Sequence, residues 1–208
     1  MSPPLHIGLL LCHTFAPILQ QVGGLNYSAI FRQQFLNIDH NIRFTDFNAY
    51  EGELPSGVDQ CDVWLINGSP AGAYDDLDWI HQLSDFIEQL NEAKKPTFGI
   101  CFGHQLIAQA LGGQVEQSGK GWGLGISHNT VVAHKAYMQP QANTIDVMVF
   151  HQDQVVQLPE GAQVLASSEF CPNYMVQYNP HMLSIQGHPE FNTQMVEGVL
   201  CGPSFDHR

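Results

Sequence analysis

The stretch from residue 96 to residue 113 constrains the fold of this chain more than any other part of it. A short apolar run, Phe98–Ile100, leads directly into Cys101, and apolar residues at helical spacing then continue as far as Gly112 and Gly113. This pattern places Cys101 at a corner where a strand passes into a helix. The two glycines predict the end of that helix.

Two further glycines flank the corner, Gly99 two residues before Cys101 and Gly103 two residues after it. At such positions a tight turn brings neighbouring backbone too close for most side chains, as in the Gly-x-Ser-x-Gly elbow that exposes a nucleophile. A helix N-terminus also favours the thiolate form of a cysteine. An isolated cysteine is more often a buried structural residue, but the paired glycines favour a nucleophile here.

Strand-like and helix-like segments alternate along the first half of the chain. We expect strands at residues 5–11, 41–48 and 63–66, and helices at residues 26–38 and 76–92, before the corner at Cys101. The apolar spacing places Ile38 on the buried face of the first helix and Leu77 on that of the second. Alternation of this kind predicts an α/β fold with a doubly wound, mostly parallel sheet, in a flavodoxin-like arrangement of three layers.

The second half of the chain changes character, with short strand candidates separated by Gly, Pro and Asn and no strong helical stripe. The candidates lie at residues 124–132, 145–150, 163–167, 174–178 and 182–185, and a short helix is expected at about 192–200. We expect these strands to form antiparallel hairpins against the parallel sheet. The length of 208 residues predicts a single domain over residues 1–208.

Charge and cysteine content exclude several classes of function. Twenty acidic side chains against seven basic ones give a formal net charge of −13, and no Lys/Arg cluster is present. Such a surface repels phosphate and anionic lipid, so we expect neither nucleic-acid nor membrane binding. The first apolar run is short and no basic residue precedes it, which predicts a cytoplasmic location. The five cysteines are widely spaced, so no disulfide framework is expected.

Neither a metal site nor a cofactor is predicted. Three histidines could be considered as ligands, His128, His134 and His151, but no two of them have helical i, i+3 or i+4 spacing. The glycine-rich run Gly121–Gly125 opens a strand, whereas a phosphate-binding loop should open a helix.

A cysteine nucleophile needs a base, and the base needs a third group that orients its ring. His188 and Glu190 suit these roles because the two residues of extended chain between them put both side chains on the same side. A single histidine among eleven is more often structural. A His-Pro-Glu sequence at a strand end, together with the elbow at Cys101, favours the catalytic interpretation.

The segments Gly99–Gln105 and Gly187–Glu190 together resemble the class I (triad) glutamine amidotransferase family. Four other segments are similar to the free-standing branch related to the amidotransferase domain of GMP synthase: Glu51–Pro55, Gly68–Pro70 with the following Tyr74–Asp76, Gly121–Gly125 and His151–Asp153. The resemblance covers almost the whole chain.

In that family a cysteine attacks the side-chain amide of glutamine, forms a glutamyl thioester and releases ammonia. The resemblance implies that Cys101 is the nucleophile, His188 the acid and base, and Glu190 the orienting carboxylate. It also implies that the backbone N–H groups of Gly68 and Phe102 form the oxyanion hole, at positions where such donors must lie. The residues that would hold the amino-acid end of the substrate are Gln105, Phe150, Gln152 and Asp153.

Two features depart from the resemblance. The chain has no Gly-x-x-x-x-Gly-Lys-Ser/Thr loop and no room for a synthase domain, so ammonia would pass to a separate synthase subunit or be released. The family usually has more chain after the last helix, so we expect that helix to be truncated.

Three functions remain open from the sequence. The first is a glutaminase or amidotransferase that supplies ammonia to a synthase partner, and the second is a γ-glutamyl peptidase or amidase acting on a γ-glutamyl compound. The third is a non-catalytic regulatory protein on the same fold. An intact Cys-His-Glu set argues against the third, because folding does not require these residues together.

Overall fold

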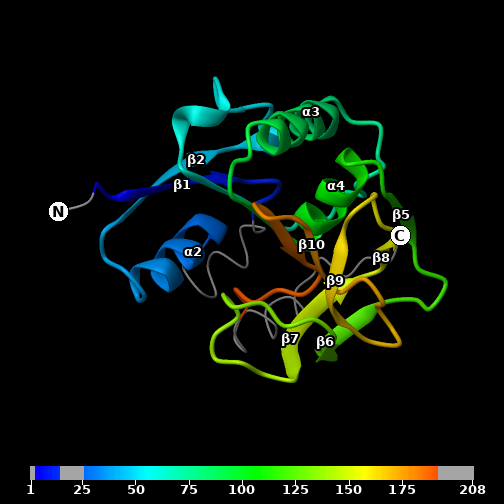
Figure 1. Ribbon diagram of the computed structural model, residues 1–208. Coiled ribbons are helices and arrows are strands. Elements are labelled where there is room, and N and C mark those ends of the chain that lie inside the picture. Colours follow the sequence, from blue (N-terminus) through cyan, green and yellow to red (C-terminus); the bar gives the residue numbers. More distant parts are fainter. Residues whose placement is uncertain (1–2, 15–25, 192–208) are drawn as a thin grey trace.

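The computed structural model of the protein describes residues 3–14 and 26–191, and a nine-stranded sheet forms the centre of this part (Figure 1). Five neighbouring strands run parallel: β2 (Ile42–Phe47), β1 (Leu5–Leu10), β3 (Val63–Ile66), β4 (Thr97–Ile100) and β11 (Met182–Ile185). Four more continue the sheet, each antiparallel to its neighbour: β10 (Met175–Asn179), β9 (Gln163–Ser167), β6 (Gly123–Val131) and β7 (Thr144–His151).

Helices cover both faces of the parallel strands (Figure 1). Two of them, α3 (Asp78–Glu92) and α4 (Phe102–Ala110), lie together on one face, and α2 (Tyr27–Leu36) lies on the other. Two 3-10 turns, η1 (Ala49–Glu51) and η2 (Val58–Gln60), connect β2 to β3. This confirms the predicted α/β fold, with a parallel part in three layers and antiparallel strands from the second half. In the described ranges no helix has the length and apolarity needed to cross a membrane.

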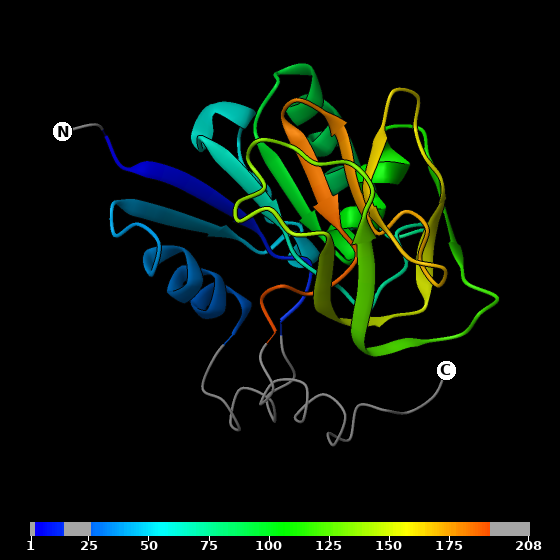
Figure 2. The ribbon, with the colours of Figure 1, turned by 60° about the horizontal axis from the view of Figure 1, so that its bottom comes forward.

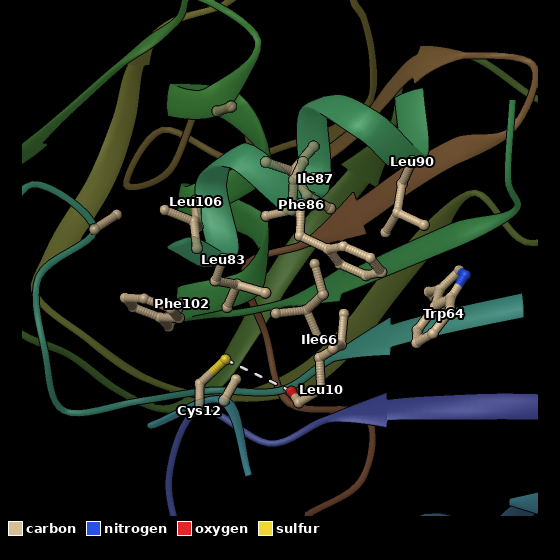
Figure 3. Packing of buried hydrophobic residues seen from close by; sticks show 14 of the residues in the cluster. Leu10, Cys12, Trp64, Ile66, Leu83, Phe86, Ile87, Leu90, Phe102 and Leu106 are labelled. Carbon is tan, nitrogen blue, oxygen red and sulfur yellow. Dashed lines mark hydrogen bonds between the residues drawn. The ribbon is translucent and has the colours of Figure 1, made fainter. Parts of the chain in front are cut away.

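Alternating side chains of the parallel strands build a separate core on each face. Leu10 and Ile66 pack with residues of α3 and α4, as Figure 3 shows, whereas Leu9 and Leu65 pack with residues of α2. Successive residues of a strand point to opposite faces, so strands covered on both sides are apolar throughout. For this reason the short apolar runs predicted these strands correctly.

The ends of two helices differ from the prediction. α2 ends at Leu36, where the N–H groups of Ile38 and Asp39 both donate to the carbonyl oxygen of Phe35 and turn the chain out of the helix. Ile38 is therefore 83% exposed, not buried as predicted. α3 begins at Asp78, so Leu77 lies before the helix and is 42% exposed. Apolar spacing alone did not locate either end.

The sequence analysis did not predict the separate antiparallel pair of strands, β5 (Gln114–Gln117) and β8 (Asp153–Gln157). These strands bury few apolar side chains, chiefly Val115 and Val155, so they leave no period-two pattern to read. Figure 2 shows β10 and β11 between the parallel strands and the antiparallel part, which joins the two halves in one sheet. The helix expected at 192–200 lies outside the described residues.

The corner between β4 and α4 is a close approach of backbone segments. Cys101 has φ 53° and ψ −103°, a strained conformation for a residue with a side chain. A Cβ atom on Gly99 would lie 2.5 Å from the carbonyl oxygen of Gly103, and one on Gly103 would lie 2.5 Å from that of Ile66. Both distances are too short, so the glycines are required by this approach, as the sequence pattern predicted.

We predict that Gly103→Ala lowers the stability of the protein. Alanine favours a helix over glycine by about 1 kcal/mol, whereas overpacking costs about 1–3 kcal/mol or more, and here the added methyl meets backbone. A net loss therefore isolates the clash with Ile66. Thermal unfolding followed by circular dichroism measures it, at about 2–4 °C per kcal/mol for a chain of this size. Gly119→Ala is the matched control, because nothing lies within 4 Å of its Cβ position. Equal melting temperatures for the two variants would contradict the close-approach argument.

Candidate active site

Cys101, His188 and Glu190 lie together where β4 and β11 end. These strands pair in parallel with Ile100 opposite Ile185, and the N–H of Cys101 donates to the carbonyl oxygen of Ile185 at 2.9 Å. The chain after β11 is fixed from the other side by β7, because the N–H of His188 donates to the carbonyl oxygen of Met148 at 2.7 Å. Main-chain hydrogen bonds from two neighbouring strands therefore set the position of both motifs.

The imidazole of His188 is held in a single orientation. Its Nδ1 lies 2.8 Å from Oε1 of Glu190, and both side chains are buried. The ring of Phe191 stacks on the imidazole, with centroids 4.1 Å apart and an angle of 9° between the planes. A carboxylate only accepts hydrogen bonds, so Nδ1 carries the proton and Nε2 is left for another partner. Nε2 is the atom that an adjacent thiol can use.

The charges at this site favour a protonated imidazole. Burial alone would lower the pKa of His188, but the Glu190 carboxylate and the sulfur of Cys101, which is hydrogen-bonded to His188, act in the opposite direction and together prevail. The pKa of His188 therefore lies well above its ordinary value. A protonated imidazole between a carboxylate and a sulfur is the arrangement of a thiolate–imidazolium pair.

Gly68 borders both catalytic candidates from the end of β3. A Cβ atom at Gly68 would lie 2.9 Å from Cε1 of His188 and 3.6 Å from Cβ of Cys101, so a side chain there would push the imidazole away. The loop is anchored by Asn67, whose Oδ1 accepts from the N–H of Cys12 at 2.6 Å. Phe102 is the first residue of α4, where backbone N–H groups have no acceptor within the helix. Gly68 and Phe102 thus flank Cys101 from two sides.

The residues expected to bind the substrate occupy different surroundings. The amide nitrogen of Gln105 donates to the carbonyl oxygen of Asp153 at 2.9 Å and to Oε1 of Gln186 at 3.1 Å, so it is already used inside the protein. Phe150 is half-buried and packs against Trp122, with ring centroids 5.3 Å apart.

Gln152 and Asp153 follow directly in the chain. Oε1 of Gln152 accepts from Nε2 of Gln117 at 3.0 Å. The Asp153 carboxylate accepts from the hydroxyl of Tyr74, and partial burial raises the pKa of Asp153. Through its carbonyl oxygen Asp153 is also connected to Gln105. Hydrogen bonds therefore connect Gln105 and Asp153 to the surroundings of Cys101.

Two polar residues at the site were not predicted. Gln186 is fully buried and its Nε2 lies 3.6 Å from the sulfur of Cys101. Asn67 is fully buried and holds the Gly68 loop. Each directly precedes a glycine of a recognised motif, which was the signal available in the sequence.

The histidines considered as metal ligands have separate surroundings. His128 pairs with Asp146 at 3.1 Å, whereas His134 is exposed. His151 is buried against Phe170, and burial lowers its pKa to about 4. Within residues 3–14 and 26–191 no group of three or more His, Cys, Asp or Glu side chains is arranged to hold a metal ion.

Comparison with known proteins identifies relatives of this chain. Gamma-glutamyl peptidase 3 from Arabidopsis thaliana is 35% identical over 162 residues, which are 74% of this chain and 65% of that protein. A subunit of the glutamine-hydrolyzing GMP synthase from Sulfolobus acidocaldarius is 33% identical over 130 residues, 62% of this chain and 67% of that protein. This chain thus spans about two thirds of the length of these curated relatives.

A solved structure of a glutamine amidotransferase from Thermotoga maritima has the same fold, with a TM-score of 0.77 and 19% sequence identity over 94% of this chain and 80% of that chain. Residues 24–198 match the family described as Glutamine amidotransferase class-I. The matched range contains the elbow at Cys101 and the His188–Glu190 segment. The chain therefore belongs to the class I glutamine amidotransferase family of hydrolases.

Proposed function

We propose that this protein is a cysteine hydrolase that cleaves the γ-amide bond of γ-glutamyl conjugates such as γ-glutamyl peptides. The buried Cys101, His188 and Glu190 carry the proposal, because their geometry supplies a nucleophile, a proton carrier and an orienting carboxylate. The similarity to Gamma-glutamyl peptidase 3 supports a conjugate as substrate. Free glutamine is the competing substrate, and the similarity to a GMP synthase subunit supports it, in which case a separate synthase subunit would be the partner.

In the proposed reaction the Cys101 thiolate attacks the carbonyl carbon of the γ-amide, and the carbonyl oxygen becomes an oxyanion. The N–H groups of Gly68 and Phe102 stabilise that oxyanion. His188 then donates its Nε2 proton to the leaving nitrogen, the C–N bond breaks, and a γ-glutamyl thioester remains on Cys101. Water attacks the thioester with His188 as base, which releases glutamate and regenerates the thiol–imidazole pair.

The amino-acid end of the substrate would lie toward β7 and β8. There the Asp153 carboxylate is suited to an ammonium group, and Gln105, Phe150 and Gln152 would complete the contact surface. Because the amide nitrogen of Gln105 is bonded internally, Gln105 would contribute its carbonyl oxygen. None of these steps requires a metal or a cofactor.

A panel of γ-glutamyl substrates tests the proposal. We predict that purified protein releases amine from γ-glutamyl dipeptides and γ-glutamyl anilides with a higher kcat/KM than it releases ammonia from glutamine. Cys101→Ala should reduce every turnover by several orders of magnitude, on the order of 10³-fold or more, because the covalent route is lost. Preference for glutamine would favour the amidotransferase function instead. Turnover that persists in Cys101→Ala would remove the proposed mechanism.

Kinetics of Glu190→Gln test the orienting carboxylate. The change keeps the shape of the side chain but removes a charge that raises the pKa of His188, so the imidazolium becomes less stable. We expect kcat and kcat/KM to fall together, on the order of 10²- to 10⁴-fold, with little change in KM. Glu160→Gln, at an exposed turn, is the control. A large rise in KM at constant kcat would assign Glu190 to substrate binding and contradict its place in the triad.

A further inference from the structure

Gln186 occupies a position that the proposed mechanism does not yet use. It lies immediately after β11, directly beside Cys101 at the end of β4, because these strands pair with Ile185 opposite Ile100. Its side chain is fully buried and its Nε2 lies 3.6 Å from the sulfur of Cys101. A buried amide that contacts a nucleophile can act on it either as a donor or as an acceptor, so the orientation of the amide decides its effect.

The hydrogen bonds around Gln186 determine that orientation. The carbonyl oxygen of Asp153 is a main-chain group that can only accept, so the side chain of Gln105 must present its NH₂ group to it at 2.9 Å. The same NH₂ group donates to the Gln186 side chain at 3.1 Å, which must therefore present its oxygen to Gln105. The NH₂ group of Gln186 is then left to face Cys101.

We infer that Gln186 is a further catalytic residue, which donates a hydrogen bond to the Cys101 sulfur and favours the thiolate, and that Gln105 is the positioning residue that fixes the direction of this bond. This inference deepens the proposed function and rests on Cys101 being its nucleophile. The bond gives the sulfur a second partner besides His188 and connects the nucleophile to Asp153 on β8. A hydrogen bond to a charged group contributes about 1.5–3 kcal/mol, which is equivalent to roughly one to two pH units.

Titration of the sulfur can be measured without interference from the other groups around it. Burial raises the pKa of Tyr27, Cys171 and Tyr174, the groups that interact with Cys101 from α2, the turn after β9 and the chain before β10, and keeps them neutral. Burial also lowers the pKa of His104 to about 3 and that of His151 to about 4.

In the described part of the chain, the groups that remain to titrate with the sulfur are His188 and Glu190. Both are left intact by changes at Gln186, so a shift in the titration of the sulfur would come from the altered hydrogen bond.

The test is the pH dependence of Cys101 alkylation by iodoacetamide, with the labelled cysteine identified by peptide mapping. Gln186→Met keeps the size of the side chain and removes the donor, and we expect the midpoint of the profile to rise by about one pH unit or more. Gln186→Glu places a carboxylate beside the sulfur and should raise it further. Gln105→Met leaves Gln186 intact but frees its amide to rotate, so a smaller rise is expected. Gln157→Met, at an exposed position of β8, is the control.

Thermal unfolding of each variant shows whether the fold is kept. A midpoint in Gln186→Met equal to that of Gln157→Met, with native melting, would overturn the inference. If Gln186→Met does not fold, Gln186→Glu decides, and an unchanged midpoint in that variant also overturns it. Alkylation needs no substrate, so a failed substrate panel with shifted midpoints removes only the proposed function. Activity on the panel with unshifted midpoints removes only the role of Gln186.

Discussion

The site depends on the close approach of three backbone segments at the end of β3, the end of β4 and the start of α4. Gly103 lies against the carbonyl oxygen of Ile66 and Gly99 against that of Gly103, distances that no side chain could share. This approach forces Cys101 into a strained conformation and sets it on the first turn of α4, beside Gly68. Strain of this kind persists only where the surrounding structure determines it, and here both cores supply that support.

A second constraint is the burial of charge. Glu190 is 2% exposed and His188 is 4% exposed, and moving isolated charges of this kind out of water is unfavourable. The carboxylate, the imidazole and the sulfur compensate one another, so removing any one of them leaves the others uncompensated. Gln186 and Asn67 add fixed donors and acceptors around this group. The result is a preorganised polar site in an apolar setting, which is how hydrolases stabilise charge that develops during reaction.

Much of this could be predicted from the sequence, for a physical reason. Buried parallel strands are apolar throughout, and the elbow requires glycine at Gly99 and Gly103, so both leave marks in residue identity. Helix ends leave weaker marks, as Ile38 and Leu77 show, and β5 and β8 bury too little to leave a pattern. Gln186 and Asn67 could not be assigned, because their partners lie 85 and 55 residues away and only the fold brings them together.

The most direct test of a covalent role for Cys101 is to trap its acyl intermediate. Protein mixed with a γ-glutamyl anilide is quenched in acid during turnover, and the cysteine-containing peptides are analysed by mass spectrometry. We predict one added γ-glutamyl group on the peptide that contains Cys101, and none in the Glu190→Gln or Cys101→Ala proteins at the same time of quenching. A γ-glutamyl group on a peptide containing Cys12, Cys61 or Cys171 instead, with turnover intact, would contradict the account.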